Sequence, residues 1–320
     1  MKVLDELDVC NCKKWTMKTR VPRRVTILNV IITVAAVLGL ALSLVAGLRL
    51  LTGRGLGFGL WRVKHLGLAL LDRHSITATT QDQYTNVIFL HHSTGYYLIA
   101  QGSVRERLTQ EGFDFWDHNY NQWGLFRPDG SQTGYSYIIP GDNTDPDGLA
   151  RIFAQRVYPF PINALSGLLQ HEVIVFKSCF PASNITSDEQ LEQYKAWYLE
   201  MRDVMDAHPE RVFVVMSPPP LNPAATTPEA AARARAFADW LISDEYLDGH
   251  PNVYTFDFFD HLAEDDPSAP DYNMLRSDYR DGVDSHPNQR ANEIVGPAFS
   301  EAVMDAARSY REGNWFDIPY

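Results

Sequence analysis

The sequence predicts a three-layer α/β domain with a parallel sheet, preceded by an N-terminal transmembrane helix. From about residue 84 onward, short apolar segments of strand length alternate with longer segments of helical character. Near-continuous apolar strands are typical of a parallel sheet that helices cover on both faces, and the alternation indicates a βαβα order. Ahead of this region, the run Val25–Leu48 holds 24 residues without a charged side chain.

The run Val25–Leu48 is long enough for a membrane span. A helix of this length would extend about 36 Å, and a hydrocarbon core is about 30 Å thick. The apolar stretch of a cleaved signal peptide is usually only about 7–15 residues, so we expect an uncleaved anchor. Basic residues are denser before the run than after it, which favours a cytoplasmic N-terminus and places the large domain outside. We therefore expect a basic cytoplasmic tail at 1–24 and a single-pass anchor at 25–48.

Residues 49–83 are expected to form a juxtamembrane linker. Within it, residues 53–73 mix glycine, leucine and a few basic residues. This mixture suits either an amphipathic segment in the membrane interface or a plain stalk, and the sequence does not separate the two.

The folded domain is expected at 84–311, followed by a C-terminal tail at 312–320. The expected strands are apolar and rich in β-branched and aromatic residues: Asn86–His91, Phe113–Trp116, Glu172–Lys177, Arg211–Met216 and Val253–Phe258. The expected helices lie between and after them, at Tyr97–Gln110, Leu149–Gln155, Ser187–Ala207, Pro228–Ser243 and Asn288–Tyr310. Ser187 and Pro228 support two of the helix starts, because serine is a favoured N-cap and proline fits the first helical turn.

Charge is distributed unevenly along the chain. Residues 1–73 carry 12 Lys/Arg and 4 Asp/Glu, whereas the remainder carries 16 and 36. An acidic body of this kind argues against a nucleic-acid-binding protein, which needs a basic surface to neutralise phosphates. The three cysteines are too few for a disulfide framework or for an all-cysteine zinc site.

Three expected strand or helix boundaries carry residues suited to catalysis. Ser93 follows the first strand, Asn184 follows the third, and Asp284 and His286 precede the last helix. Ligand sites in open α/β sheets gather at the C-terminal ends of the strands, so these residues can converge. A serine hydroxyl, a histidine base and an orienting carboxylate form the set that nucleophilic catalysis uses, and an asparagine amide can stabilise an oxyanion.

The order Ser93, Asn184, Asp284, His286 resembles the SGNH, or GDSL-like, hydrolase superfamily over residues 84–311. The resemblance implies a flavodoxin-like α/β fold and a serine esterase that needs no metal or other cofactor. It also implies an oxyanion hole formed by Ser93, Asn184 and a glycine after the second strand, for which Gly124 is the candidate. The usual family spacing would place the aspartate at position 283, which is a valine here. Asp284 fits a variant of the family in which the aspartate lies two residues before the histidine, and Asp281 is the alternative.

The expected substrate is a small acyl ester, with an O-acetyl group on a glycan as one form. An O-acyltransferase with the same residues, or a glycan-binding domain without catalysis, are the alternatives. An aromatic group near the second strand could line a sugar-stacking cleft or pack in the core; its members are Trp116, Tyr120, Trp123, Tyr135 and Tyr137. The segment 140–148 is rich in oxygen ligands for Ca²⁺ but lacks the spacing of an EF-hand loop, so a helix-capping loop is the simpler interpretation.

Overall fold

The computed structural model describes residues 56–77, 82–140 and 144–313, together with four residue pairs between positions 35 and 47. The chain divides into a unit of residues 1–60 and a compact unit of residues 61–320. Most of the predicted span Val25–Leu48 lies outside the described residues, so it stays a prediction. Within the part of the chain that is described, no helix has both the length and the apolar character needed to cross a bilayer.

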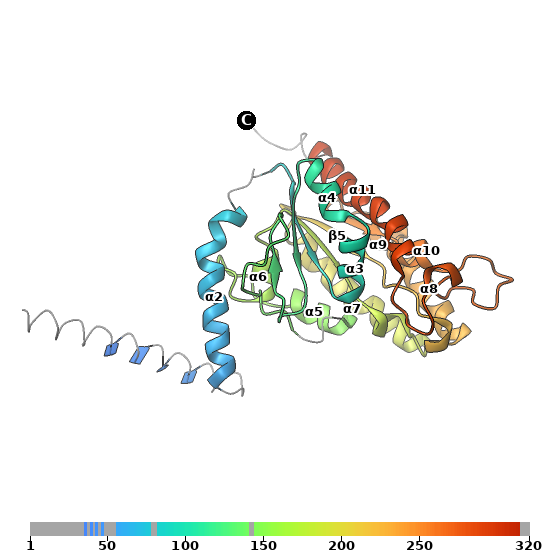
Figure 1. The fold of residues 1–320 in the computed structure, drawn as a ribbon, viewed down its shortest axis with the longest axis horizontal. Coiled ribbons are helices and arrows are strands. Elements are labelled where there is room, and N and C mark those ends of the chain that lie inside the picture. The colour runs from blue at the N-terminus through green and yellow to red at the C-terminus, as the bar shows by residue number, and fades with distance from the viewer. Residues whose placement is uncertain are drawn as a thin grey trace, which may run out of the picture. The chain divides into compact units, whose positions relative to one another are not determined.

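The compact unit is built on a sheet with helices packed around it (Figure 1). The sheet has six strands in the order β3-β2-β1-β4-β5-β6. β3 pairs antiparallel with β2, and the other neighbours pair in parallel. Without β3, the order is that of flavodoxin-like sheets, which confirms the predicted α/β class of the folded domain. The strands are β1 Asn86–Leu90, β2 Asp114–His118, β3 Leu125–Phe126, β4 Val173–Lys177, β5 Val212–Met216 and β6 Val253–Phe256.

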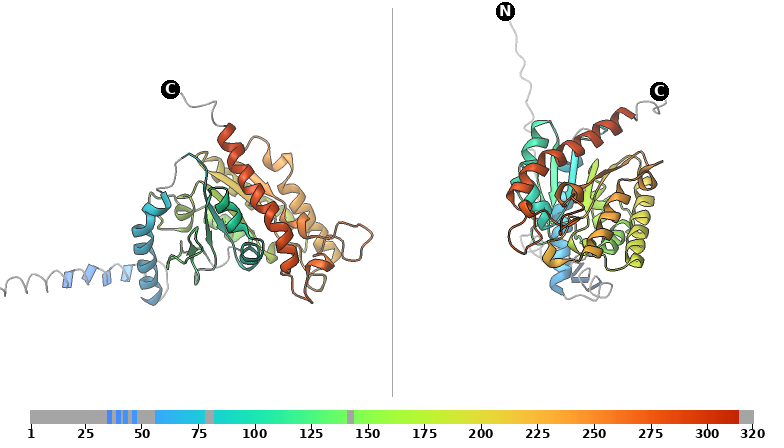
Figure 2. Two further views of the ribbon diagram at one scale, coloured as in Figure 1. Left: turned by 45° about the horizontal axis from the view of Figure 1, so that its top comes forward. Right: turned by 90° about the vertical axis from the view of Figure 1, so that its right-hand side faces the viewer.

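Helices cover both faces of this sheet (Figure 2). Successive side chains of a strand point to opposite faces, so Val87 and Phe89 of β1 pack in one apolar cluster and Ile88 and Leu90 in the other. The first cluster includes residues of α3 Ser93–Gln101, α4 Val104–Gln110, α10 Phe258–Leu262 and α11 Gln289–Gly313. The second includes residues of α5 Pro146–Phe153, α6 Ala164–Leu168, α7 Asp188–Asp206, α8 Pro228–Leu241 and α9 Asp244–Leu247.

The expected linker is helical over much of its length, and part of it packs on the folded unit, where an interfacial segment or a plain stalk was expected. Leu56–Thr77 forms α2, and its Ile76 is fully buried in the second apolar cluster. The Asn86 side chain donates a 2.6 Å hydrogen bond to the Ile76 carbonyl, and Arg127 forms a 2.6 Å ion pair with Asp72. The portion of α2 from residue 61 onward is therefore an integral part of the folded unit.

Two element boundaries differ from the sequence prediction. The expected helix Tyr97–Gln110 is two helices, because Ser103 between α3 and α4 has the left-handed φ of 54°. The expected strand Val253–Phe258 ends at Phe256, and Phe258 begins α10 instead. The strand β3 and the helices α6 and α9 have no counterpart among the predicted elements. The remaining elements lie close to their predicted positions, with shifts of a few residues at most ends.

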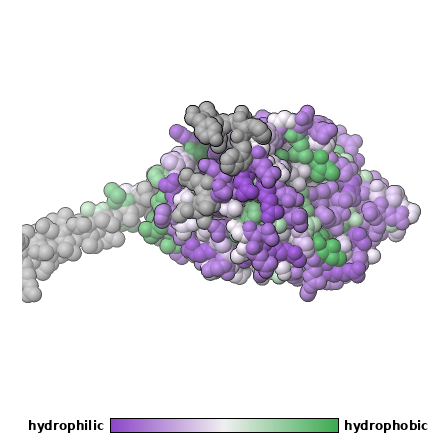
Figure 3. Space-filling view, turned by 90° about the horizontal axis from the view of Figure 1, so that it is seen from above, coloured by the Kyte–Doolittle hydropathy of each residue, from purple (hydrophilic) through white to green (hydrophobic). Residues whose placement is uncertain are grey.

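The surface of the folded domain is mostly hydrophilic on the side shown in Figure 3. Hydrophobic residues appear there in small, separate patches rather than as one continuous face. This agrees with the acidic composition of the chain after residue 73.

Candidate active site

The connection from β1 to α3 places a serine at the C-terminal edge of the sheet. Ser93 is the first residue of α3, and His92 occupies the N-cap position. The helix can start this close to the strand because residue 95 is glycine. A Cβ atom at Gly95 would lie 2.4 Å from the Cβ of His91, a distance that side chains do not tolerate.

The loop before α11 is held in place by Asn222, which follows β5. The Asn222 backbone N–H donates a 3.0 Å hydrogen bond to Ser285 Oγ. Its side-chain amide donates to the carbonyls of Gly282 and Asp284 at 3.1 and 3.0 Å. Asn222 is buried, so this anchor fixes the backbone on both sides of Asp284 and thereby the approach to His286.

The structure brings Ser93, His286 and Asp284 into one hydrogen-bonded chain. His286 Nε2 lies 2.8 Å from Ser93 Oγ, and His286 Nδ1 lies 2.8 Å from Asp284 Oδ1. A carboxylate can only accept, so Nδ1 carries the proton and Nε2 is free to accept from the serine hydroxyl. This is the arrangement in which a histidine can act as general base toward a serine.

Aromatic rings hold the His286 imidazole on two sides. The ring of Tyr97, from α3, meets it edge-on with centroids 5.7 Å apart. The ring of Phe180, from the short helix Phe180–Ser183 after β4, does the same at 5.0 Å. These contacts limit the rotation of the imidazole without competing for its two nitrogens.

Asp284 is the carboxylate that meets His286, and Asp281 is not. The hydrogen bond from the His286 side chain holds the pKa of Asp284 below its usual value, so this group is ionised at neutral pH. The backbone N–H of His286 also donates to Asp284 Oδ1 at 3.2 Å. Among the described residues, Asp281 has no hydrogen-bond or ion-pair partner, and its side chain is exposed.

A pocket of about 380 Å³ opens beside Ser93. It lies between α3 and the segment that follows β2. Its lining is mostly aromatic and includes no charged residue: Ser93, Tyr96, Tyr97, Asn119, Tyr120, Trp123, Phe126 and Gln132. Such a lining suits a neutral, partly apolar group with a flat or ring-shaped surface.

The predicted aromatic group divides between this pocket and the core. Tyr120 and Trp123 line the pocket and are partly exposed, at 41% and 52%. Trp116, Tyr135 and Tyr137 are buried and pack in the apolar cluster that contains α5 and α7. The sequence could not separate these two sets, because both fall near β2 and both are aromatic.

The candidate oxyanion donors do not all meet at Ser93. The Ser93 N–H lies in the first turn of α3, where helix geometry leaves the N–H groups without an intrahelical acceptor. The Gly124 N–H, in contrast, donates to the Tyr120 carbonyl at 2.8 Å. Gly124 has a φ of 70°, so its role is in the turn before β3, and the prediction of Gly124 as an oxyanion donor conflicts with this hydrogen bond.

Asn184 lies after β4, as the sequence predicts, and its side chain is exposed. It lines an open hollow of about 680 Å³ together with residues such as Thr186, Thr227 and Arg233. This hollow is formed by the loop after β4 and the start of α8, and Ser93 is not among its lining residues. The role of Asn184 as an oxyanion donor stays a prediction.

Asn119 is a pocket residue that the sequence analysis did not single out. It follows β2 directly and lines the pocket beside Ser93. Its Oδ1 accepts a 2.8 Å hydrogen bond from the Tyr120 N–H, and no described residue accepts from its side-chain NH₂ group. That group is therefore a candidate donor toward a ligand. Its position at the C-terminal end of a strand was the available signal.

The oxygen-rich segment 140–148 is described only in part, because residues 141–143 lie outside the described residues. Asp145 occupies the N-cap position of α5 and Pro146 lies in its first turn, but the Asp145 side chain makes no capping hydrogen bond to this helix. Among the described residues, no cluster of three or more histidine, cysteine, aspartate or glutamate side chains is arranged to hold a metal ion.

Comparisons with known proteins found similarity only among solved structures. No family model and no curated protein matches the chain. A GDSL-like lipase from Bacteroides thetaiotaomicron aligns with 75% of this chain and 99% of its own, at 10% identity and a TM-score of 0.43. A chain from Streptococcus pneumonia named for platelet activating factor aligns with 78% and 94%, at 12% identity and a TM-score of 0.38. At these TM-scores the function rests on the geometry of the site and not on the alignments.

Proposed function

We propose that this protein is a membrane-anchored serine hydrolase of the SGNH type that cleaves small acyl esters. The observation that carries the proposal is the continuous chain from Ser93 Oγ to His286 to Asp284, with both hydrogen bonds at 2.8 Å. A serine that only begins a helix needs no histidine at hydrogen-bond distance, and a partly buried histidine such as His286 needs no ionised partner.

The proposed reaction proceeds by acyl transfer to the serine and then to water. Ser93 Oγ attacks the ester carbonyl while His286 Nε2 takes the hydroxyl proton. His286 then gives this proton to the leaving alcohol, and Asp284 stabilises the imidazolium that exists between the two steps. The Ser93 N–H and the Asn119 side-chain amide are the donors best placed to hold the oxyanion. In the second step, water attacks the acyl-serine while His286 takes a proton from it; the bond between the acyl carbon and Ser93 Oγ then breaks, His286 returns the proton to Oγ, and the carboxylic acid is released.

The pocket beside Ser93 supports a neutral substrate with a ring-shaped portion. Tyr120 and Trp123 offer exposed aromatic faces, on which sugar rings can pack, and Asn119 and Gln132 offer polar contacts to hydroxyl groups. Its lining carries no charged side chain that would bind an anionic headgroup. We therefore propose an O-acetylated neutral glycan as the substrate class.

We expect a fluorophosphonate probe to label the purified full-length protein at Ser93. Such probes react with serines that a neighbouring base activates, and Ser93 is the described serine that meets a histidine side chain together with its carboxylate. The measurement is mass spectrometry of the labelled peptide, with heat-denatured protein as the control. Absence of labelling in the folded protein, or labelling at another serine, would contradict the proposal.

The membrane anchor at 25–48 remains part of the proposal, with the domain from α2 onward outside the cytoplasm. The charge-free run and the preceding basic residues support it. We expect the full-length chain to stay with membranes during sodium carbonate extraction and to be released by detergent. A chain beginning at residue 56, which keeps α2, is the matched control and should be released by carbonate. Release of the full-length chain by carbonate alone would refute the anchor.

A further inference from the structure

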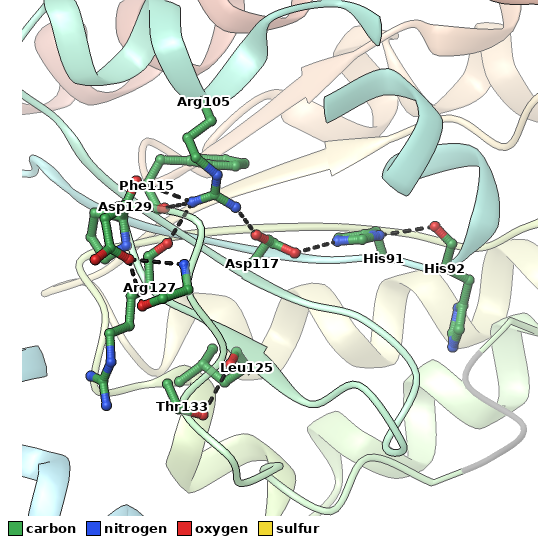
Figure 4. A network of polar contacts seen from close by, with 11 residues as sticks. His91, His92, Arg105, Phe115, Asp117, Leu125, Arg127, Asp129 and Thr133 are labelled. Atoms are coloured by element: carbon green, nitrogen blue, oxygen red, sulfur yellow. Dashed lines mark hydrogen bonds and ion pairs between the residues drawn. The ribbon is translucent and has the colours of Figure 1, made fainter. Parts of the chain in front are cut away.

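We propose that His91, held by Asp117 and Arg105, is a positioning residue that aims the oxyanion-binding N–H of Ser93; this inference rests on the proposed hydrolase function. His91 follows β1 directly and lies two residues before Ser93. His91, Asp117 and Arg105 take no part in the hydrogen-bonded chain of Ser93, His286 and Asp284. Figure 4 shows the line of contacts from Arg105 through Asp117 and His91 to the carbonyl of His92.

His91 is buried and uses both of its ring nitrogens. Nδ1 lies 2.9 Å from the carbonyl oxygen of His92, and Nε2 lies 2.9 Å from Asp117 Oδ2. A carbonyl and a carboxylate both accept hydrogen bonds, so each ring nitrogen of His91 faces an acceptor. The ring therefore bridges a fixed carboxylate on β2 and the peptide unit that joins His92 to Ser93.

The Asp117 carboxylate is fixed in turn by Arg105 of α4. Arg105 pairs with the second oxygen of Asp117, and its guanidinium also donates to the carbonyls of Phe115 and Arg127 at 2.7 and 2.6 Å. Burial raises the pKa of the Asp117 carboxyl, but the hydrogen bonds and charges of His91 and Arg105 outweigh burial and hold it below its usual value. Asp117 is thus an ionised, immobile acceptor for His91.

The geometry of the peptide unit links this network to the site. In a trans peptide, the C=O and N–H bonds point in opposite directions. The His92 carbonyl accepts from His91 Nδ1 and, at 2.9 Å, from the N–H of Tyr96. Two donors on this carbonyl fix the plane of the peptide, and so fix the direction of the Ser93 N–H on its other side. Hydrogen bonding at the carbonyl also polarises that N–H, which strengthens it as a donor.

The His91 side chain also supports the first turn of α3 sterically, because Gly95 packs directly on it. A change to alanine would therefore combine a cavity with the loss of the hydrogen bonds. His91→Gln is the sharper test, since it keeps a polar side chain of similar length but cannot bridge Asp117 and the His92 carbonyl as a ring does.

His171 provides a matched control. It is fully buried, and both of its ring nitrogens are hydrogen-bonded, to Tyr137 Oη at 3.0 Å and to Asn86 Oδ1 at 2.8 Å. It precedes β4, however, and so lies at the N-terminal edge of the sheet, away from Ser93. His171→Gln makes the same chemical change at a site that only contributes to stability.

We expect His91→Gln to lower kcat on a soluble ester by about 10- to 100-fold, because a misdirected oxyanion donor weakens the transition state. KM should change by less than about threefold, since the ground-state ester does not need this N–H. The rate constant for fluorophosphonate labelling should fall in parallel. It is taken from the time course of the labelled fraction, so it does not depend on the yield of folded protein. His171→Gln should keep the wild-type kcat.

The proposal is overturned if His91→Gln keeps kcat and labelling rate within about threefold of His171→Gln. Asp117→Asn is the second variant, because it weakens the hold on His91 without changing the turn itself. Asp117→Asn should also lower kcat and leave KM unchanged. If both His91→Gln and Asp117→Asn react with the probe at the wild-type rate, the proposal is likewise overturned. Failure of the wild-type protein to react with probe or ester is a different result, which would refute the hydrolase function instead.

Discussion

Ser93→Ala is expected to abolish ester hydrolysis while leaving the protein folded. Removal of one member of a serine, histidine and carboxylate set costs on the order of 10⁴- to 10⁶-fold in kcat in enzymes that use it. Alanine removes the hydroxyl that His286 Nε2 meets at 2.8 Å, and it fits the first turn of a helix without strain. The measurement is kcat/KM on a small acyl ester, with circular dichroism as the check on folding.

Ser217→Ala is the matched control for this change. Ser217 also follows a strand at the C-terminal edge of the sheet, but its hydroxyl donates to Asp257 at 2.8 Å and accepts from the Phe259 N–H. Its loss should reduce stability and leave kcat/KM close to that of the wild type. A Ser93→Ala protein that retains substantial esterase activity would show that Ser93 is not the nucleophile.

Asp284→Asn is expected to reduce kcat/KM by about 10⁴-fold at neutral pH, by analogy with other triads. An asparagine at this position can donate to Nδ1 of His286, which places the imidazole proton on Nε2 and removes its ability to accept from Ser93. It also removes the negative charge that stabilises the imidazolium. The pKa of Asp284 is lowered by its hydrogen bond to His286, so the wild-type carboxylate keeps its charge across the neutral range.

Asp281→Asn is the comparison that tests the choice between the two carboxylates. Asp281 is exposed and touches neither His286 nor Ser93 in a hydrogen bond or ion pair. We expect its variant to remain within a few-fold of wild-type kcat/KM. A large loss for Asp281→Asn with near-normal activity for Asp284→Asn would assign the orienting role to Asp281.

The choice of Asp284 could be predicted from local geometry. Residues two apart on an extended segment share a face, which places Asp284 beside His286 whatever the rest of the chain does. The strands could be predicted for a similar reason, because a run such as Val173–Lys177 is apolar at nearly every position and fits only a doubly covered sheet. The role of Asn222 in holding this loop had no such signal, since it depends on contacts with residues 60 or more positions away.

Two predictions, the linker at 49–83 and Gly124 as an oxyanion donor, depended on contacts that the sequence does not show. Residues of α2 such as Ile76 looked like an interfacial or stalk segment, since their partners, including Asn86, lie elsewhere in the chain. Gly124 was chosen for its type and its position after β2, but the direction of its N–H depends on the turn it makes with Tyr120. The pocket residue Asn119 lay in the same segment, and its position directly after β2 was the only signal that could have singled it out.

The sequence by itself indicated the α/β class and five of the six strands, and it singled out Ser93, His286 and Asp284 as candidate site residues. These depend on apolar periodicity and on residue chemistry, both of which are local. Only the tertiary structure decided which of them meet, because Ser93 and His286 are 193 positions apart and their 2.8 Å contact exists only when β1 and α11 share one sheet edge. It also decided which aromatic residues line the pocket and which fill the core, because burial depends on what the rest of the chain packs against each side chain.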